Sequence, residues 1–155
     1  MNKEFKSYIF TGIKTSCTGC GACAQICAKK ALLMQPDEDG FLYPVMDADK
    51  CVQCGLCDSR CPEVKDYSNN EPDQHCFIAT TDKKEYYKES ASIGICTMLS
   101  DYIVSNGGIV YGAYLDENDW TVYHIGVSNK DGVQKIRNSK YVQSDTRNTY
   151  YEVKE

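Results

Sequence analysis

The sequence lacks any long apolar run. No window approaches the length of a membrane span, and residues 1–10 mix charges of both signs with single aromatic side chains, unlike a signal peptide. It also lacks a basic surplus, because 17 Lys and Arg stand against 22 Asp and Glu, which gives a formal net charge of −5. We therefore expect a cytoplasmic protein with no membrane and no nucleic acid among its partners.

Histidine and tryptophan are scarce, with two and one residues, whereas cysteine is abundant. Ten cysteines are present, and eight of them fall within residues 17–61. A segment this short, with little else to build a core, needs either disulfides or bound metal to hold it together. Disulfides require an oxidising compartment, so a cytoplasmic chain favours metal.

The eight cysteines form two copies of one pattern, C-x-x-C-x-x-C-x-x-x-C. The second copy follows the first at a constant shift of 34 residues. Such a repeat predicts two similar half-units about a pseudo-two-fold axis, each a cysteine loop followed by a short helix. In two-cluster ferredoxins, the first three cysteines of a run bind one 4Fe-4S cluster and the fourth binds the other. The predicted ligands are Cys17, Cys20, Cys23 and Cys61 for cluster one, and Cys51, Cys54, Cys57 and Cys27 for cluster two.

The residues between the cysteines agree with this interpretation. Gly19, Gly21 and Gly55 allow the backbone to curl and to direct N–H groups at cluster sulfurs. Pro62 follows the second run as expected, whereas Ala28 stands where the first run would carry a proline. Zinc is the alternative metal, but its sites prefer paired C-x-x-C knuckles separated by a longer loop. The spacing therefore predicts two 4Fe-4S clusters and one-electron transfer.

The remaining pattern predicts a second domain. We expect an α+β chain: a two-cluster ferredoxin-like domain over 1–68, a linker over 69–75 and a partial α/β domain over 76–155. A sheet of two or three strands is marginal alone, so we expect this second domain to be incomplete. The expected elements are a hairpin of 31–34 and 41–45, strands over 76–80, 109–115 and 120–127, and helices over 97–105, 129–137 and 146–155. The apolar strand 109–115 is expected to be buried on both faces.

A Ser-rich segment, residues 90–94, precedes one predicted helix. Ser90 or Ser92 could cap that helix. Alternatively, Ser90, Ser92 and Gly94 form a cradle for a phosphate or a flavin. Four other candidate ligands are interpreted as ordinary buried or surface residues, namely Cys76, Cys96, His75 and His124.

Three segments outside the cysteine runs carry a family resemblance: Asp39–Pro44, Asn106–Ala113 and Ser139–Ser144. With the ferredoxin-like runs, their order resembles the N-terminal part of the deazaflavin-coenzyme (F-420) hydrogenase/dehydrogenase beta-subunit family. Members are iron-sulfur flavoproteins, many of them from anaerobes. The resemblance implies an oxidoreductase that binds FAD or FMN when complete and exchanges electrons with a redox partner protein or subunit. Ile93 replaces a family glycine beside the predicted cradle.

Three functions follow from these patterns. The first is the electron-input module of a flavin-dependent oxidoreductase, whose catalytic residues are unknown. The second is a free-standing electron carrier without an organic cofactor. The third is a zinc-stapled interaction module without a redox role.

Overall fold

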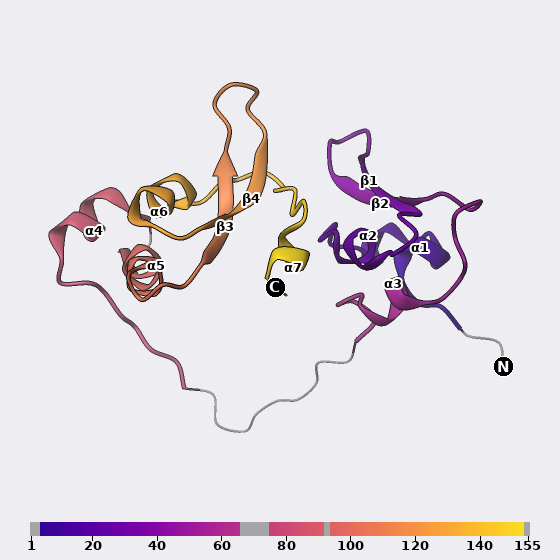
Figure 1. Cartoon of the computed structure of the whole chain (residues 1–155), viewed down its shortest axis with the longest axis horizontal. Coiled ribbons are helices and arrows are strands. Elements are labelled where there is room, and N and C mark those ends of the chain that lie inside the picture. The colour runs from indigo at the N-terminus through magenta and orange to yellow at the C-terminus, as the bar shows by residue number, and fades with distance from the viewer. Residues whose placement is uncertain (1–3, 66–74, 92–93, 154–155) are drawn as a thin grey trace. The chain divides into compact units, whose positions relative to one another are not determined.

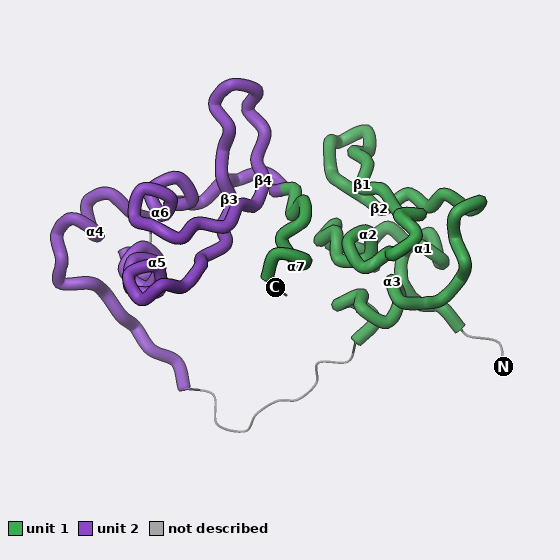
Figure 2. Tube along the Cα trace, viewed as in Figure 1, with its two compact units in different colours: residues 1–70, 145–155 green, residues 71–144 purple. Residues whose placement is uncertain are grey.

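The computed structural model describes residues 4–65, 75–91 and 94–153 and contains helices and two small antiparallel sheets. Its residues form two units, shown separately in Figure 2. Unit 1 comprises residues 1–70 and 145–155, and unit 2 comprises residues 71–144. This division groups 145–155 with the cysteine runs, whereas the sequence ranges grouped them with the second domain. Most of the expected linker 69–75 lies outside the described residues.

Unit 1 is built from short elements around one hairpin, which confirms the hairpin predicted from the sequence (Figure 1). Leu32 pairs with Met46 and Pro36 with Leu42. The Asp37 carboxylate closes the turn by accepting the backbone N–H groups of Asp39 and Phe41. The elements are α1 (Tyr8–Thr11), the 3-10 helix η1 (Lys14–Ser16), α2 (Ala22–Ile26), β1 (Leu32–Pro36), β2 (Leu42–Met46), α3 (Leu56–Ser59) and α7 (Thr149–Glu152).

The two helices α2 and α3 follow the two cysteine loops and begin in the same way. Gly21 and Gly55 occupy the residue before each helix with φ of 76° and 77°, in the left-handed region. These glycines are equivalent in the repeat. A side chain on such a backbone costs roughly 1–2 kcal/mol, so the turn from loop into helix depends on glycine at both places.

Unit 2 places helices α5 and α6 against a two-stranded antiparallel sheet (Figure 1). Its buried core consists of Val104, Val127 and Val133. Helix α5 ends at a glycine pair as expected, because Gly107 adopts φ of 81° and the Gly108 N–H bonds to the Ile103 carbonyl. The elements are α4 (Lys84–Glu89), α5 (Ile95–Ser105), β3 (Val110–Leu115), β4 (Val122–Val127) and α6 (Lys130–Ile136).

Three expectations for residues 76–155 were wrong. Residues 76–80 form no strand, and Phe77 and Ile78 are exposed. Strand β3 is half-buried along its length rather than buried on both faces, since it has a single partner, β4. The predicted helix 146–155 is limited to α7 within the described residues.

No helix in the described ranges combines the length and apolarity that crossing a membrane would need.

Candidate metal centres

One cavity of unit 1 gathers cysteines from both runs. The loop between η1 and α2 contributes two of them, α2 itself contributes the third, and the fourth follows α3. Gly19, Gly21 and Pro62 also line this cavity. Its cysteines are Cys17, Cys20, Cys23 and Cys61.

A second cavity of the same unit gathers the other four. Two lie in the loop that leads into α3, the third lies in α3 itself, and the fourth directly follows α2. Apolar side chains of Ala31, Leu32 and Leu56 complete its wall. Its cysteines are Cys51, Cys54, Cys57 and Cys27. Each cavity therefore takes three cysteines from one run and the last cysteine of the other.

The chemistry of this donor set suits iron-sulfur clusters. None of the ten cysteines forms a disulfide bond, so every sulfur is available to metal. Burial, followed by the neighbouring Cys20, raises the pKa of Cys23 to about 12, and burial also raises the pKa of Cys17 and Cys57. The thiolates that ligate metal are therefore unfavourable in these cavities unless positive charge accompanies them, and iron supplies such charge.

Backbone N–H groups already point at cysteine sulfur atoms. The Gly19 N–H lies 3.4 Å from Cys17 Sγ, and the Ala31 N–H lies 3.3 Å from Cys27 Sγ. Hydrogen bonds of this kind stabilise negative charge on ligand sulfurs, and they raise the reduction potential of a bound cluster. Each cavity therefore contains backbone N–H groups that bond to cysteine sulfur.

A single-ion site is not formed by these residues. Across 4–65, 75–91 and 94–153, no group of three or more His, Cys, Asp or Glu side chains converges as one ion would require. A zinc ion holds its sulfurs at about 2.3 Å, which brings them within roughly 4 Å of each other. A cube of four irons and four sulfides keeps its ligands further apart. Four cysteines line each cavity, most of them from one C-x-x-C-x-x-C run, and this is the donor set that a 4Fe-4S cluster takes.

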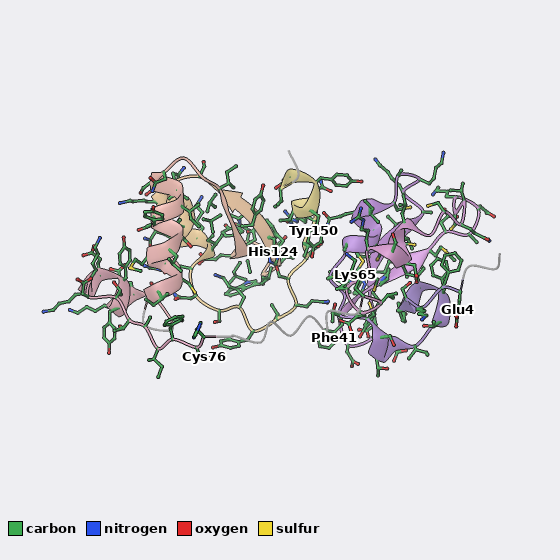
Figure 3. The ribbon with its side chains drawn as sticks, turned by 90° about the horizontal axis from the view of Figure 1, so that it is seen from below. Glu4, Phe41, Lys65, Cys76, His124 and Tyr150 are labelled. Atoms are coloured by element: carbon green, nitrogen blue, oxygen red, sulfur yellow. The ribbon has the colours of Figure 1, made fainter. Side chains whose placement is uncertain are left out.

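The two cysteines outside the runs lie in unit 2 and are exposed. Cys76 lies in the irregular segment before α4, and Cys96 lies in the first turn of α5. Figure 3 shows His124 on β4, where its Nδ1 is 2.9 Å from the Ser144 hydroxyl. That contact accounts for His124 within unit 2.

The predicted phosphate or flavin cradle is described only in part. The Ser90 hydroxyl lies 2.8 Å from the Thr97 hydroxyl, and both line a cavity of unit 2 with Ser100 and Arg137. Ser92 lies outside the described residues. The sequence analysis did not identify Arg137 or Thr97 as residues of this cavity. Arg137 lies at the end of another helix, far from Ser90 in sequence.

Gly94 rather than a serine occupies the N-cap position of α5. The expectation was a cap by Ser90 or Ser92; Ser90 does not occupy the cap position, and Ser92 lies outside the described residues. Gly94 has φ of 76°, and a Cβ there would lie 2.6 Å from the Tyr86 carbonyl oxygen. Glycine is thus required for close packing against α4.

The sequence analysis also missed a set of hydrogen bonds made by the C-terminal residues. Residues from the C-terminal end of the chain hydrogen-bond with the loop of the first cavity, at sequence separations of 121 to 126 residues. The contacts join Thr146 and Tyr150 to Cys20 and Gln25. Figure 3 labels Tyr150, on α7. No spacing rule in the sequence links positions so far apart.

Comparison with known proteins agrees with the geometry of unit 1. Residues 16–64 match the 4Fe-4S dicluster domain family. Three relatives come from Methanocaldococcus jannaschii. An uncharacterised ferredoxin is 39% identical over 49 residues, which are 32% of this chain and 62% of the relative. An uncharacterised polyferredoxin-like protein is 31% identical over 85 residues, which are 44% of this chain and 51% of the relative. An iron-sulfur subunit of CoB–CoM heterodisulfide reductase is 34% identical over 58 residues, covering 29% and 9%.

Together, these findings define the class of the N-terminal part. Residues 16–64 form a ferredoxin-type domain for two 4Fe-4S clusters, and its chemistry is iron-sulfur electron transfer. The chain spans less than two thirds of the length of each of these relatives. The narrower resemblance to the F-420 hydrogenase/dehydrogenase beta-subunit family is not shown by them.

Proposed function

We propose that this chain carries electrons through two 4Fe-4S clusters and serves as the electron-input module of a flavin-dependent oxidoreductase. The grouping of eight cysteines around two cavities, three from one run and one from the other, supports this proposal most strongly. The proposed ligands of cluster one are Cys17, Cys20, Cys23 and Cys61, and those of cluster two are Cys27, Cys51, Cys54 and Cys57.

Each bound cluster would accept and release one electron, with a potential set by its environment. The chain's own contribution is to hold the thiolates, to direct N–H groups at sulfur and to exclude water. The second cavity does the last with Leu32, Leu56 and Ala31. Crossed ligation also makes the two half-units interdependent, because each cluster would tie one loop to the other.

The test is iron, sulfide and zinc content of the anaerobically purified chain, followed by electron paramagnetic resonance after dithionite reduction. Two clusters predict about eight irons and eight sulfides per chain, and a spectrum of two interacting reduced centres. Stoichiometric zinc with little sulfide would refute electron transfer and favour the structural module.

The flavin part of the proposal concerns unit 2. Ser90, Ser92 and Gly94 would take a phosphate of FAD or FMN, and Arg137 supplies positive charge to the cavity that Ser90 lines. The Arg137 guanidinium already pairs with Glu89 at 3.1 Å, at a side-chain exposure of 17%. A flavin phosphate would compete with that carboxylate for the same cation.

Flavin titration separates the module from a free-standing carrier. An electron-input module with a formed flavin site quenches flavin fluorescence on binding, and Arg137→Gln weakens that binding. A chain with eight irons that leaves flavin fluorescence unchanged would be a carrier alone. Its partner would in either case be another redox protein, and the net charge of −5 favours one with a basic docking surface. The cytoplasm is the proposed location.

A further inference from the structure

Ser7 carries a buried hydroxyl without a hydrogen-bond partner. Only 2% of the residue is exposed, and its Oγ makes no hydrogen bond within the described residues. Such a group gives up its hydrogen bonds to water on folding and gains none in return, so it is unfavourable in the folded chain. Unsatisfied buried groups are rare in native proteins, and a bound ion or cofactor is one kind of partner that satisfies them.

The backbone of Ser7 is held from two sides. Its N–H donates to Asp58 Oδ1 at 2.7 Å, which ties it to α3. Its carbonyl accepts the N–H groups of Phe10 at 3.0 Å and Thr11 at 3.1 Å, both in α1. Ser7 is the N-cap residue of α1, where a serine hydroxyl ordinarily accepts a backbone N–H, but this hydroxyl makes no such bond. The residue is therefore fixed in place, and its hydroxyl takes no part in capping the helix.

Ser7 lines the first cavity together with the four cysteines proposed for cluster one. From the same stretch of chain, Phe10 rather than Ser7 lines the second cavity. Ser16 and Thr18 also line the first cavity, but they are half-buried and exposed, so water can bond to their hydroxyls. Water does not reach the Ser7 hydroxyl, whereas the sulfur atoms of a bound cluster carry negative charge and accept hydrogen bonds.

We propose that the Ser7 hydroxyl donates a hydrogen bond to a sulfur atom of cluster one and thereby raises the reduction potential of that cluster. This inference rests on the proposed ligation of cluster one. Reduction adds one electron and increases the negative charge on the sulfur atoms, so a hydrogen-bond donor stabilises the reduced state more than the oxidised one. The same bond gives the hydroxyl the acceptor that the chain itself does not provide.

The test is voltammetry of the full chain with both clusters loaded. Ser7→Ala removes the hydroxyl and keeps the Cβ. Ser59→Ala is the matched control, because the Ser59 hydroxyl donates to the Leu56 carbonyl of its own helix at 2.9 Å. Variants Cys20→Ser and Cys54→Ser assign each wave to its cluster. We expect Ser7→Ala to shift the wave of cluster one to a more negative potential, with the wave of cluster two unchanged, and Ser59→Ala to move neither.

A second measurement observes the hydrogen bond itself. Electron–nuclear double resonance of the reduced chain, exchanged into deuterated water, detects deuterons that are coupled to a cluster. The wild type and Ser59→Ala should share one coupled deuteron that Ser7→Ala lacks. Identical couplings in the wild type and Ser7→Ala would show that the hydroxyl does not donate to the cluster.

Two results keep this inference separate from the proposed function. If the wild type contains no clusters, the proposed ligation fails. If it contains both and Ser7→Ala moves neither wave, or both equally, the role of Ser7 is refuted and the ligation stands.

A variant that fails to load cluster one is covered by a second substitution. Ser7→Gly also lacks the hydroxyl, and glycine fits the extended backbone of this residue, with φ of −72° and ψ of 157°. A negative shift of the cluster-one wave in Ser7→Gly supports the role. An unchanged wave contradicts it, and so does the absence of cluster one from both variants, since the hydroxyl would then be needed for binding rather than for the potential.

Discussion

Replacement of single cysteines distinguishes two schemes of ligation. In crossed ligation, the last cysteine of each run binds the cluster of the other run. In local ligation, all four cysteines of a run bind one cluster. Cys61 belongs to the second run in sequence, but it lines the cavity of the first. Cys57, four residues earlier, lines the other cavity. Replacement of either by alanine removes one of four thiolates, and a cluster missing a ligand is expected to be lost or reduced to three irons.

The magnitude follows from the dicluster match. A chain with two 4Fe-4S centres holds about eight irons, so complete loss of one centre leaves about four. The spectrum of the reduced protein should then lose the interaction between its two paramagnetic centres. Iron analysis and electron paramagnetic resonance of both variants, purified without oxygen, measure these two effects.

Which cluster remains in each variant decides between crossed and local ligation. Crossed ligation predicts that Cys61→Ala gives the same remaining spectrum as Cys20→Ala, and that Cys57→Ala gives the complementary one. Local ligation predicts instead that Cys61→Ala and Cys57→Ala leave the same centre. That second result would refute the assignment drawn from the two cavities. Cys76→Ala, an exposed residue of unit 2, is the control and should retain all iron.

Three further predictions concern single side chains. Gly21→Ala should destabilise the folded chain by more than Gly12→Ala, because a Cβ at Gly21 would meet Thr146 whereas nothing lies within 4 Å of a Cβ at Gly12. Gly12→Ala then carries only the strain of the left-handed backbone, roughly 1–2 kcal/mol. Chemical denaturation of both variants measures the difference in their free energies of unfolding. Lys14 holds the pKa of the Asp37 carboxyl below its usual value, so its stabilising effect is present above about pH 4 and disappears as the pH falls through the folded pKa; unfolding of Asp37→Asn across pH measures this, and a difference from wild type that persists at low pH contradicts it. Tyr86→Phe removes the 2.8 Å donor to the buried Asp101 carboxylate and should cost about 1–3 kcal/mol, against under about 0.5 kcal/mol for the exposed Tyr87→Phe.

The cysteine runs show what local spacing can predict. Cluster ligands must converge within a short loop, so their separations in sequence carry the geometry directly. The same holds for the hairpin around Asp37, where turn residues and alternation lie within a dozen positions. Helix α5 was likewise predictable, because its periodic apolar residues end at Gly107. These features need no information from the rest of the chain.

The errors occurred where a residue's environment depends on distant segments. Residues 76–80 carry strand-forming side chains, but a strand also needs a partner, and Ile78 is fully exposed. The continuous apolar run at 109–115 predicted a strand buried on both faces. Burial also depends on how many strands the sheet contains, and within the described residues this strand has only one partner. In both cases local propensity was correct in kind and the tertiary context decided the outcome.

The two cysteine loops combine both lessons. By local pattern the loops are equivalent, since the repeat matches Gly21 with Gly55 and both have the same backbone conformation. The bond from the Thr146 hydroxyl to the Cys20 carbonyl spans 126 residues in sequence. Spacing within a run therefore predicts how a loop folds, because the residues that shape it are close in sequence, but it cannot predict which distant residues pack on that loop.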